Sequence, residues 1–265
     1  MKRSILITGA YGGMGKAAAK KLSDMGFRVF ALDRSVEAQA EEDIIPIEAD
    51  VTDGESIKSA YEKVCELTDS LFAIVHFAGI YMLDSLVEID TVDFEKIFKV
   101  NLEGAFLINK SFFGLLKKGS RILITTSELA PLDPLPFTGI YAITKAALDK
   151  YAYSLRMELQ LKGIDVSVLR AGAVDTGMLG ASTAALDRFH EKTKMYSCNA
   201  ARFKRIVEGV EARRVKPEKI AAKAVKILKK RHPRFSYTIN RNPLLLILNA
   251  LPRRFQFWII KRILN

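Results

Sequence analysis

Tyr141 and Lys145 stand four residues apart in the segment YAITK. On a helix, residues at this spacing share a face, so the phenol and the ammonium would point at one object. A free phenol has a pKa near about 10 and exchanges protons poorly at neutral pH, but a neighbouring ammonium favours the phenolate. The pair therefore suits acid–base chemistry at a bound molecule, although it could also be one helix pair among many.

The glycine-rich turn TGAYGGMG is a second candidate site, because it follows the apolar run SILIT and precedes a helical pattern. Gly9, Gly13 and Gly15 allow a tight turn and a close approach of the backbone to a pyrophosphate. The start of the next helix would offer free N–H groups and partial positive charge to the phosphates. Tyr11 and Met14 lie in the same turn, and we expect them to contact the nucleotide. The pattern predicts a dinucleotide site rather than an ordinary turn.

Acidic residues end the next two predicted strands. Asp33 follows Gly15 by 18 residues, about where a carboxylate binds the adenosine ribose. It would repel a 2′-phosphate and favour NAD, whereas Arg34 would pair with that phosphate and favour NADP. Asp50 is placed to accept a hydrogen bond from the adenine amino group, or else to cap a turn. We expect NAD, with NADP as the alternative.

The scaffold for these residues is an alternation of strand and helix patterns. Nearly continuous apolar runs, typical of strands covered on both faces, occupy residues 4–8, 27–32, 44–49, 71–77, 121–126 and 165–170. Long amphipathic segments at 94–116 and 143–163 predict helices, Gly26 is a natural helix C-cap, and Asp53 is a natural N-cap. The alternation predicts an α/β fold in one domain, a doubly wound parallel sheet in a three-layer α/β/α arrangement.

The composition fits a folded domain, since 49% of the 265 residues are hydrophobic. The two cysteines, Cys65 and Cys198, form no CxxC motif, so we predict neither a disulfide framework nor a metal site, and a reducing, cytoplasmic setting fits. The first apolar run is too short for a signal peptide. No apolar run of about 18 residues predicts a membrane span.

The net charge of +11 is concentrated in the C-terminal part. Twelve of the 41 basic residues and none of the 30 acidic ones follow Glu218, so the total does not indicate general nucleic-acid binding. We expect a catalytic domain over residues 1–240 and a basic, apolar extension over residues 241–265. In this extension Trp258 and several aliphatic residues mix with Arg and Lys, as in membrane-surface helices. Peripheral membrane binding, an oligomer or lid helix, and nucleic-acid contact are the alternatives.

An ordered set of short motifs extends the prediction. After TGxxxGxG come Asp50-Val51, Ala78-Gly79, the motif NxxG that begins at Asn101, a serine after a late strand, and YxxxK. Together they resemble the short-chain dehydrogenase/reductase family over most of the first 180 residues. The resemblance implies a seven-stranded Rossmann-like sheet, a nicotinamide cofactor, and interconversion of an alcohol and a carbonyl on a hydrophobic steroid-, retinoid- or acyl-like molecule. A catalytically silent dinucleotide-binding sensor or scaffold is the alternative, and we expect a homo-oligomer.

The resemblance also implies roles for individual residues. The catalytic set is Asn101, Ser127, Tyr141 and Lys145. Tyr141 would exchange a proton with the substrate oxygen, Ser127 would donate a hydrogen bond to that oxygen, and Lys145 would bond the cofactor ribose. Asn101 would hold a water near Lys145. The remaining cofactor contacts would be Val51, Ala78, Gly79, Gly172, Val174 and Thr176.

The sequence also departs from the family pattern. Ser127 precedes Tyr141 by fourteen residues, one more than usual, and Thr126 is a weaker alternative. The family's NNAG reads HFAG, where we expect His76 to be a strand residue rather than a base, and its PG reads Ala171-Gly172. Residues 177–214 lie where the family places a substrate lid. Its apolar side chains would contact an apolar substrate or pack on the body: Met178, Leu179, Phe189, Met195, Tyr196 and Phe203.

Overall fold

A seven-stranded parallel sheet is the centre of the computed structural model, which describes residues 2–36, 43–211 and 214–265. The strand order is β3-β2-β1-β4-β5-β6-β7. The strands are β1 (Ser4–Thr8), β2 (Arg28–Asp33), β3 (Ile44–Glu48), β4 (Leu71–His76), β5 (Leu116–Ser127), β6 (Asp165–Ala171) and β7 (Ser236–Ile239). The six strands expected from apolar runs are present, and β5 begins earlier than expected. The short β7 is only half-buried, which explains why no apolar run marks it.

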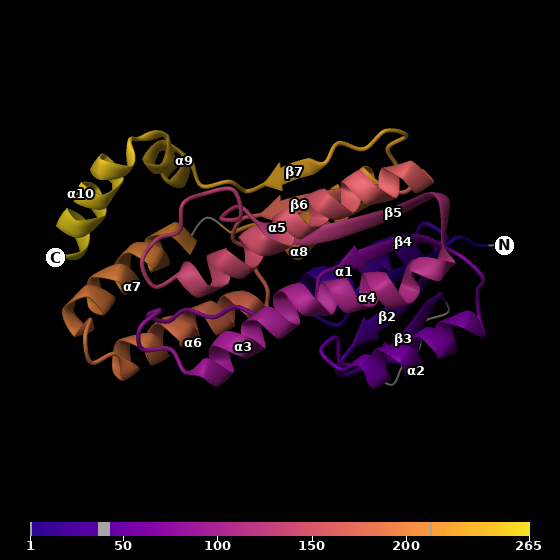
Figure 1. Ribbon diagram of the computed structural model, residues 1–265, viewed down its shortest axis with the longest axis horizontal. Helices are drawn as coiled ribbons and strands as arrows, with labels where there is room; N and C mark the ends of the chain where they lie inside the picture. Colours follow the sequence, from indigo (N-terminus) through magenta and orange to yellow (C-terminus); the bar gives the residue numbers. More distant parts are fainter. Residues whose placement is uncertain (1, 37–42, 212–213) are drawn as a thin grey trace.

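Helices cover both faces of the sheet, as the alternation predicted (Figure 1). On one face lie α1 (Gly13–Ser23) and α8 (Pro217–Leu228), and on the other lie α2 (Gly54–Cys65), α4 (Gly104–Phe112) and α5 (Gly139–Leu159). Successive residues of a strand point to opposite faces. In β1, Ile5 and Ile7 accordingly pack with α1 and α8, while Leu6 packs with the other three helices.

The expected helix ends are present. Gly26 has a φ of +82° and closes the turn after α1, where its N–H donates to the Ser23 carbonyl at 2.8 Å. A left-handed φ is the conformation that glycine adopts at little cost. The Asp53 side chain accepts a hydrogen bond from the Glu55 N–H at the start of α2, as an N-cap does.

The segment predicted as one helix over 94–116 is divided. It contains α3 (Thr91–Phe98), a π-helical turn (Lys99–Glu103), α4 and a 3₁₀ turn (Phe113–Leu115). The Gly104 N–H donates to the Lys99 carbonyl, five residues back, so one extra residue enters the turn. Such insertions leave the apolar pattern almost unchanged, and they recur at functional sites. Here the inserted turn carries the buried Asn101.

Four further helices gather at one end of the molecule, beyond the carboxyl end of β7 (Figure 1). They are α6 (Gly177–Lys192), α7 (Ser197–Glu211), α9 (Pro243–Ala250) and α10 (Arg253–Leu264). Phe189, Phe203 and Leu264 come from three of these helices and share a separate apolar cluster. This end of the molecule is therefore packed around its own small core.

Candidate active site

The candidate site lies along the edge where the parallel strands end. The strand order reverses between β1 and β4, and ligands of doubly wound sheets bind at this reversal. Gly9, which follows β1, has a φ of +66°, and a Cβ placed on it would lie 2.6 Å from the Ala78 nitrogen after β4. Only a glycine lets these two turns meet, so the backbone itself forms the floor of the crevice.

The start of α1 is open for an anion. Its N-cap is Gly12, which provides no side-chain hydrogen bond, and the first turn holds no acidic residue. A Cβ on Gly15 would lie 2.0 Å from the Gly9 carbonyl, and one on Gly13 would lie 2.7 Å from Thr176 Cγ2. The first N–H groups therefore remain available, as a diphosphate requires. Tyr11 and Met14 are partly exposed in the same turn.

Asp33 is held against the glycine-rich turn. One of its oxygens accepts a hydrogen bond from the Tyr11 N–H at 2.9 Å, and the other accepts one from the Arg34 N–H at 2.8 Å. A carboxylate has about four acceptor positions, so it retains capacity for ribose hydroxyls.

Asp50 closes a turn after β3. Its Oδ1 accepts bonds from the Thr52 N–H at 2.8 Å and the Thr52 hydroxyl at 2.7 Å. The Thr52 N–H is the main reason for a lowered pKa of Asp50, and the charge of Arg34 adds to it. Of the two roles considered, the structure shows the turn cap, and the adenine contact stays a prediction. A Cβ on Gly104 would lie 2.8 Å from Val51 Cγ2, so Val51 lies close to this glycine.

Tyr141 and Ser127 meet near the carboxyl end of β5. Tyr141 is buried in α5, and the Ser127 side chain lies near enough to its hydroxyl to lower the pKa of the phenol as a hydrogen-bond partner would. Its ring lies 4.8 Å from the ring of Tyr81, centroid to centroid. Burial raises the pKa of Tyr141, Tyr81 raises it further, and the Ser127 side chain opposes both. Thr126 instead donates to Asp149 at 3.2 Å, so Ser127 is the serine or threonine that reaches the phenol.

Lys145 lies one turn further along α5, on the same face. Its side chain is 4% exposed, and Nζ lies 5.6 Å from the centroid of the Tyr141 ring. Burial lowers the pKa of Lys145 to about 8. A Cβ on Gly79 would lie 3.2 Å from Lys145 Nζ and 3.2 Å from Asn101 Oδ1. The ammonium therefore points into the crevice between the glycine turns. The pKa of the phenol is raised, with burial as the largest cause, and not lowered as we expected.

Asn101 makes three side-chain hydrogen bonds with its neighbours. Its Oδ1 accepts from the Ile80 N–H at 2.8 Å, while Nδ2 donates to the Ile80 carbonyl at 3.0 Å and to Thr144 Oγ1 at 3.1 Å. Thr144 in turn donates to the Tyr141 carbonyl at 2.8 Å. These bonds fix the strand end after Ala78-Gly79 to α5. Both N–H groups of the amide are used, whereas Oδ1 keeps one acceptor position. The water near Lys145 stays a prediction.

The backbone after β6 is positioned by a close contact with the residue after β7. A Cβ on Gly172 would lie 1.9 Å from the Asn240 carbonyl, so the Ala171-Gly172 pair allows a close backbone contact. The buried Val174 forms a parallel bridge with Val215. Residues 177–214 therefore leave and return to the body at one place.

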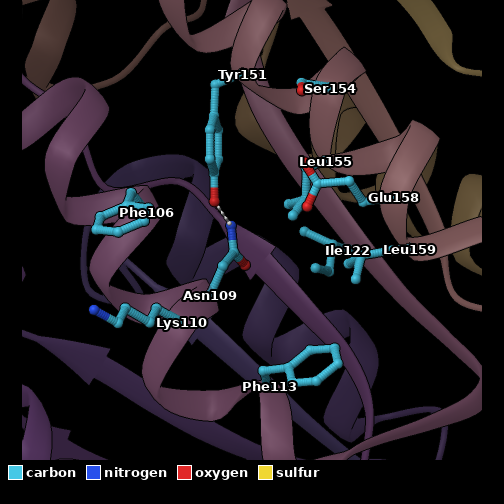
Figure 2. Close-up of a pocket in the computed structure, with 10 residues that line it drawn as sticks. All are labelled: Phe106, Asn109, Lys110, Phe113, Ile122, Tyr151, Ser154, Leu155, Glu158 and Leu159. Atoms are coloured by element: carbon cyan, nitrogen blue, oxygen red, sulfur yellow. Dashed lines mark hydrogen bonds between the residues drawn. The ribbon is translucent and has the colours of Figure 1, made fainter. Parts of the chain in front are cut away.

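His76 belongs to β4 and is buried, as expected. Its Nε2 lies 2.9 Å from Asn109 Oδ1, and burial lowers its pKa to about 4. The Asn109 amide donates to the Tyr151 hydroxyl at 3.2 Å beside a cavity of about 420 Å³ between α4 and α5 (Figure 2). This polar chain contains none of the four predicted catalytic residues. That His76 does not act as a base stays a prediction.

The sequence of the chain decides its family. The family model described as short chain dehydrogenase matches residues 3–187, which is well over half of the chain. The protein is a short-chain dehydrogenase/reductase.

Curated members of the family align with about two thirds of this dehydrogenase/reductase. Estradiol 17-beta-dehydrogenase 2 of Mus musculus is 33% identical over 190 residues, which cover 68% of this chain and 50% of the relative. NADPH-dependent 1-acyldihydroxyacetone phosphate reductase of Schizosaccharomyces pombe is 31% identical over 180 residues, 66% of this chain and 61% of the relative. The matched region is thus about half the length of the mouse protein.

Solved structures share the fold across the whole dehydrogenase/reductase chain. A short-chain dehydrogenase from Streptomyces avermitilis has a TM-score of 0.76 at 20% identity, covering 99% of this chain and 93% of its own. The 3-ketoacyl-(acyl-carrier-protein) reductase from Brucella melitensis has a TM-score of 0.73 at 20% identity, covering 89% and 96%. The Rossmann-like α/β fold of the family is therefore that of this chain.

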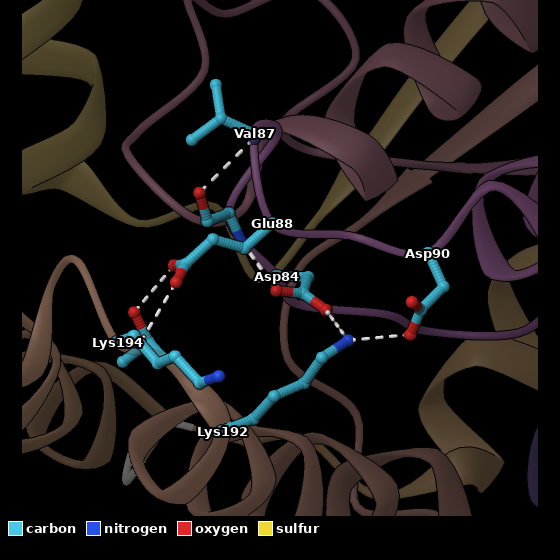
Figure 3. Close-up of polar contacts among 8 residues, drawn as sticks. Asp84, Val87, Glu88, Asp90, Lys192 and Lys194 are labelled. Carbon is cyan, nitrogen blue, oxygen red and sulfur yellow. Dashed lines mark hydrogen bonds and ion pairs between the residues drawn. The ribbon is translucent and has the colours of Figure 1, made fainter.

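Charged residues that the motifs did not indicate connect the candidate lid of this dehydrogenase/reductase to the loop that contains Glu88. Glu88 accepts bonds from Thr193 Oγ1 at 2.7 Å and from the N–H groups of Lys194 at 2.9 Å and Met195 at 3.2 Å (Figure 3). Lys192 pairs with two aspartates of the same loop, Asp84 and Asp90. No spacing rule links these residues, which lie about a hundred positions apart in the chain.

Apolar lid residues of the dehydrogenase/reductase pack on the body. Phe137 has a φ of 64°, and its ring lies 4.5 Å from that of Phe189, 5.3 Å from that of Tyr196 and 5.4 Å from that of Phe203. For these three the packing alternative holds, whereas Met195 is exposed. The side chains of Met178 and Leu179 lie outside the described residues.

Proposed function

We propose that the protein is an NAD(P)-dependent oxidoreductase that interconverts an alcohol and a carbonyl group on an apolar small molecule. The observation that carries the proposal is that the buried phenol of Tyr141 has the Ser127 side chain beside its hydroxyl and the Lys145 ammonium on the same helix face, next to Gly79. These groups surround one point where a substrate oxygen can bind.

Each side chain has a task in this reaction. A bound nicotinamide supplies or accepts hydride at the substrate carbon. In reduction, Tyr141 gives its proton to the substrate oxygen, and its raised pKa keeps the phenol protonated at neutral pH. Ser127 donates a hydrogen bond to the same oxygen and stabilises its developing negative charge. The Lys145 charge stabilises the phenolate that is left. In oxidation the same proton moves in the opposite direction.

The surroundings of Tyr141 support an apolar substrate. Four half-buried apolar residues pack around the cluster that contains Tyr141, namely Ile80, Tyr81, Met82 and Leu129. Apolar walls with a few convergent polar groups are typical of small-molecule sites. The relatives named for estradiol and for 1-acyldihydroxyacetone phosphate act on molecules with large apolar parts. A steroid-, retinoid- or acyl-like substrate is consistent with both observations.

For the cofactor we propose NAD rather than NADP. The Asp33 carboxylate lies against the glycine turn, where it would bind ribose hydroxyls and repel a 2′-phosphate. Asp33→Asn is expected to weaken NADH binding about tenfold, because hydrogen bonds to charged groups contribute about 1.5–3 kcal/mol. NADPH binding should not weaken. Titration of both dinucleotides measures the ratio, and tighter NADPH binding by the unaltered protein would reverse the assignment.

We also propose that the chain forms a homo-oligomer through α4 and α5. Phe106 of α4 and Phe113 of the 3₁₀ turn after it are exposed and line the cavity of Figure 2. Tyr153 and Met157 are exposed on α5. Large exposed apolar side chains of this kind mark contact surfaces. Sedimentation velocity of Phe106→Ser/Met157→Ser against the unaltered chain tests the proposal. A monomer in both samples would contradict it.

The decisive test of the reaction is Tyr141→Phe. Loss of a positioned proton donor lowers turnover by about 10²–10⁴-fold, while NADH binding should stay within a factor of about three because the change removes only the hydroxyl. Tyr153→Phe is the matched control, since Tyr153 is exposed on the same helix. Turnover of a steroid, retinoid or acyl ketone that survives in Tyr141→Phe would refute the assignment. Dinucleotide binding by the unaltered protein without turnover of any of these would favour the silent sensor or scaffold.

A further inference from the structure

The C-terminal helix α10 has two unlike faces. Gln256, Ile260 and Leu264 recur every four residues and lie toward the body, where Ile260 and Leu264 join the apolar cluster of α6 and α7. On the opposite side Arg254, Trp258 and Arg262 recur at the same spacing and are exposed. A helix that already buries one apolar stripe therefore presents a second face with a different composition.

The outward face is both aromatic and basic. Phe255 is 61% exposed, Phe257 is 67% exposed and Trp258 is 65% exposed, and Ile263 of the same helix is exposed as well. Lys261 is exposed on the same helix, and no acidic residue follows Glu218 in the chain. Large exposed apolar side chains rimmed by charge mark an interaction site. The partner must accept bulky apolar groups and carry negative charge.

We propose that this face of α10 docks on an anionic lipid surface. Trp and Phe side chains suit the boundary between headgroups and acyl chains, and Arg and Lys suit anionic headgroups. In a twofold contact through this face, Arg254 and Arg262 of one copy would lie close to those of the other, and these like charges repel. None of the helices in the described part has the length and apolar character needed to cross a bilayer. The contact that we propose is a peripheral one.

The neighbouring helix α9 also has exposed apolar side chains. Leu244 and Ile247 are three residues apart and exposed, so they share one face of α9. Arg241, just before this helix, is also exposed. The two helices together give the extension six large exposed apolar side chains, which are Leu244, Ile247, Phe255, Phe257, Trp258 and Ile263.

The extension is fastened to the candidate active site at two places. The buried Glu128, next to Ser127, accepts a bond from the Asn242 N–H at 2.6 Å, and the Asp133 N–H donates to Asn249 Oδ1 at 2.6 Å. Near the end of α10, the side chains of Asn199 and Arg202 in α7 donate to the Leu264 carbonyl at 2.8 and 3.1 Å. A lipid surface bound by α10 would therefore lie beside the strand end and the lid helix.

A candidate site held beside the lipid surface would receive its substrate from the bilayer. An apolar alcohol or ketone partitions into the bilayer, and a site held at the lipid surface receives it from there. Only this delivery step rests on the proposed function; the docking itself does not depend on catalysis.

Trp258 is the only tryptophan of the chain, so its fluorescence reports directly on the proposed contact. The full-length protein is mixed with vesicles of phosphatidylcholine alone or with about one third phosphatidylserine. We expect a shift of emission to shorter wavelength, and quenching by brominated acyl chains, only with the anionic vesicles. Raising the salt concentration to 1 M should reverse most of the binding, because the screening length falls to about 3 Å. No shift with anionic vesicles would overturn the proposal.

Co-sedimentation of variants with the same vesicles locates the surface. Arg254→Ser/Arg262→Ser should weaken binding about 30-fold, since each basic residue near the surface contributes about 1 kcal/mol. Lys58→Ser/Lys63→Ser removes the same charge from exposed positions on α2 and should weaken it less than twofold. Equal losses in the two variants would overturn the proposal, because binding would then follow net charge alone.

Two further measurements separate the docking from its alternatives. Tyr141→Phe should bind vesicles like the unaltered protein, so that failure of the catalytic assignment leaves this test intact. Without lipid, Trp258 emission should not depend on protein concentration. A concentration-dependent shift that accompanies a dimer, with the dimer lost in Trp258→Ser, would show that a second copy covers the face and would overturn the proposal.

Discussion

Two buried charges on α5 lie one helical turn apart and have opposite surroundings. Asp149 accepts hydrogen bonds from Arg170 Nε at 3.0 Å and Nη2 at 2.7 Å, and from Thr126. Lys145 has no hydrogen bond or ion pair with any residue in the described part of the chain, and burial lowers its pKa to about 8. The carboxylate has its partners within the fold, whereas the ammonium points at the crevice.

The two charges therefore have different roles: Asp149 supports the fold, and Lys145 is free to act on a ligand. The Asp149–Arg170 pair joins α5 to β6, and Thr126 joins both to β5, the strand that ends at Ser127. These bonds fix the position of Tyr141 relative to Ser127. A buried charge without a partner costs stability, and such costs recur where a group must be free to act on a ligand. Lys145 thus lowers the stability of the fold, and Asp149 supports it.

The largest effect on the free energy of unfolding is expected when Asp149 is removed and Arg170 loses its partner. Asp149→Ala leaves the Arg170 guanidinium mostly buried and unpaired, which costs about 3–5 kcal/mol of unfolding free energy. Asp165→Ala is the control, because Asp165 lies 3.9 Å from Arg156 and is more exposed; it should cost less than about 1 kcal/mol. Urea unfolding measures both, and equal losses would remove the distinction.

Replacing the unpaired charge of Lys145 should raise the free energy of unfolding. Lys145→Met is expected to stabilise the fold by about 3 kcal/mol at pH 7, the equivalent of a pKa lowered from 10.5 to about 8, while turnover is lost. Between these pH values the unfolded chain binds more protons than the folded one, so the stability of the unaltered protein rises with pH. The gain should therefore shrink toward pH 10.5. Unfolding at pH 7 and pH 10 tests it, and a destabilised variant would contradict it.

A third comparison uses neighbouring hydroxyls on β5. Ser127→Ala should lower turnover about 100-fold with little change in stability, because it removes one hydrogen bond to the developing charge. Thr126→Val should leave turnover within a few-fold and cost about 1 kcal/mol of stability, since Thr126 bonds only the supporting carboxylate. Steady-state kinetics and urea unfolding on both variants decide it. The reverse pattern would assign catalysis to Thr126.

The smallest effect should come from Arg170→Lys. The charge is kept, but the two-point contact with Asp149 is lost, which we expect to cost about 1 kcal/mol. Turnover should fall less than that of Ser127→Ala. Thermal unfolding and kinetics measured on one preparation test both statements, and an unchanged unfolding temperature would show that charge alone holds α5 in place.

Much of the fold could be predicted from local sequence patterns. The strand runs, the caps at Gly26 and Asp53, and the glycine turn are set by neighbours within a few residues, so they are readable from the order of residues. The π-helical turn at Asn101 was not readable, because one inserted residue leaves the amphipathic pattern intact. Glu88 and Asp149 were missed because their partners are distant in the chain and belong to no spacing rule.

The amino-acid sequence by itself determined the family, the parallel α/β sheet and the types of groups placed after its strands, since parallel strands bring their carboxyl ends to one edge. The tertiary structure alone decided which charges are paired. It placed Lys145 in a crevice without a carboxylate, turned the Asn101 amide onto Ile80 and Thr144, and directed Trp258 to solvent. Pairing and burial depend on which distant segments meet, and that is settled only when the chain is packed.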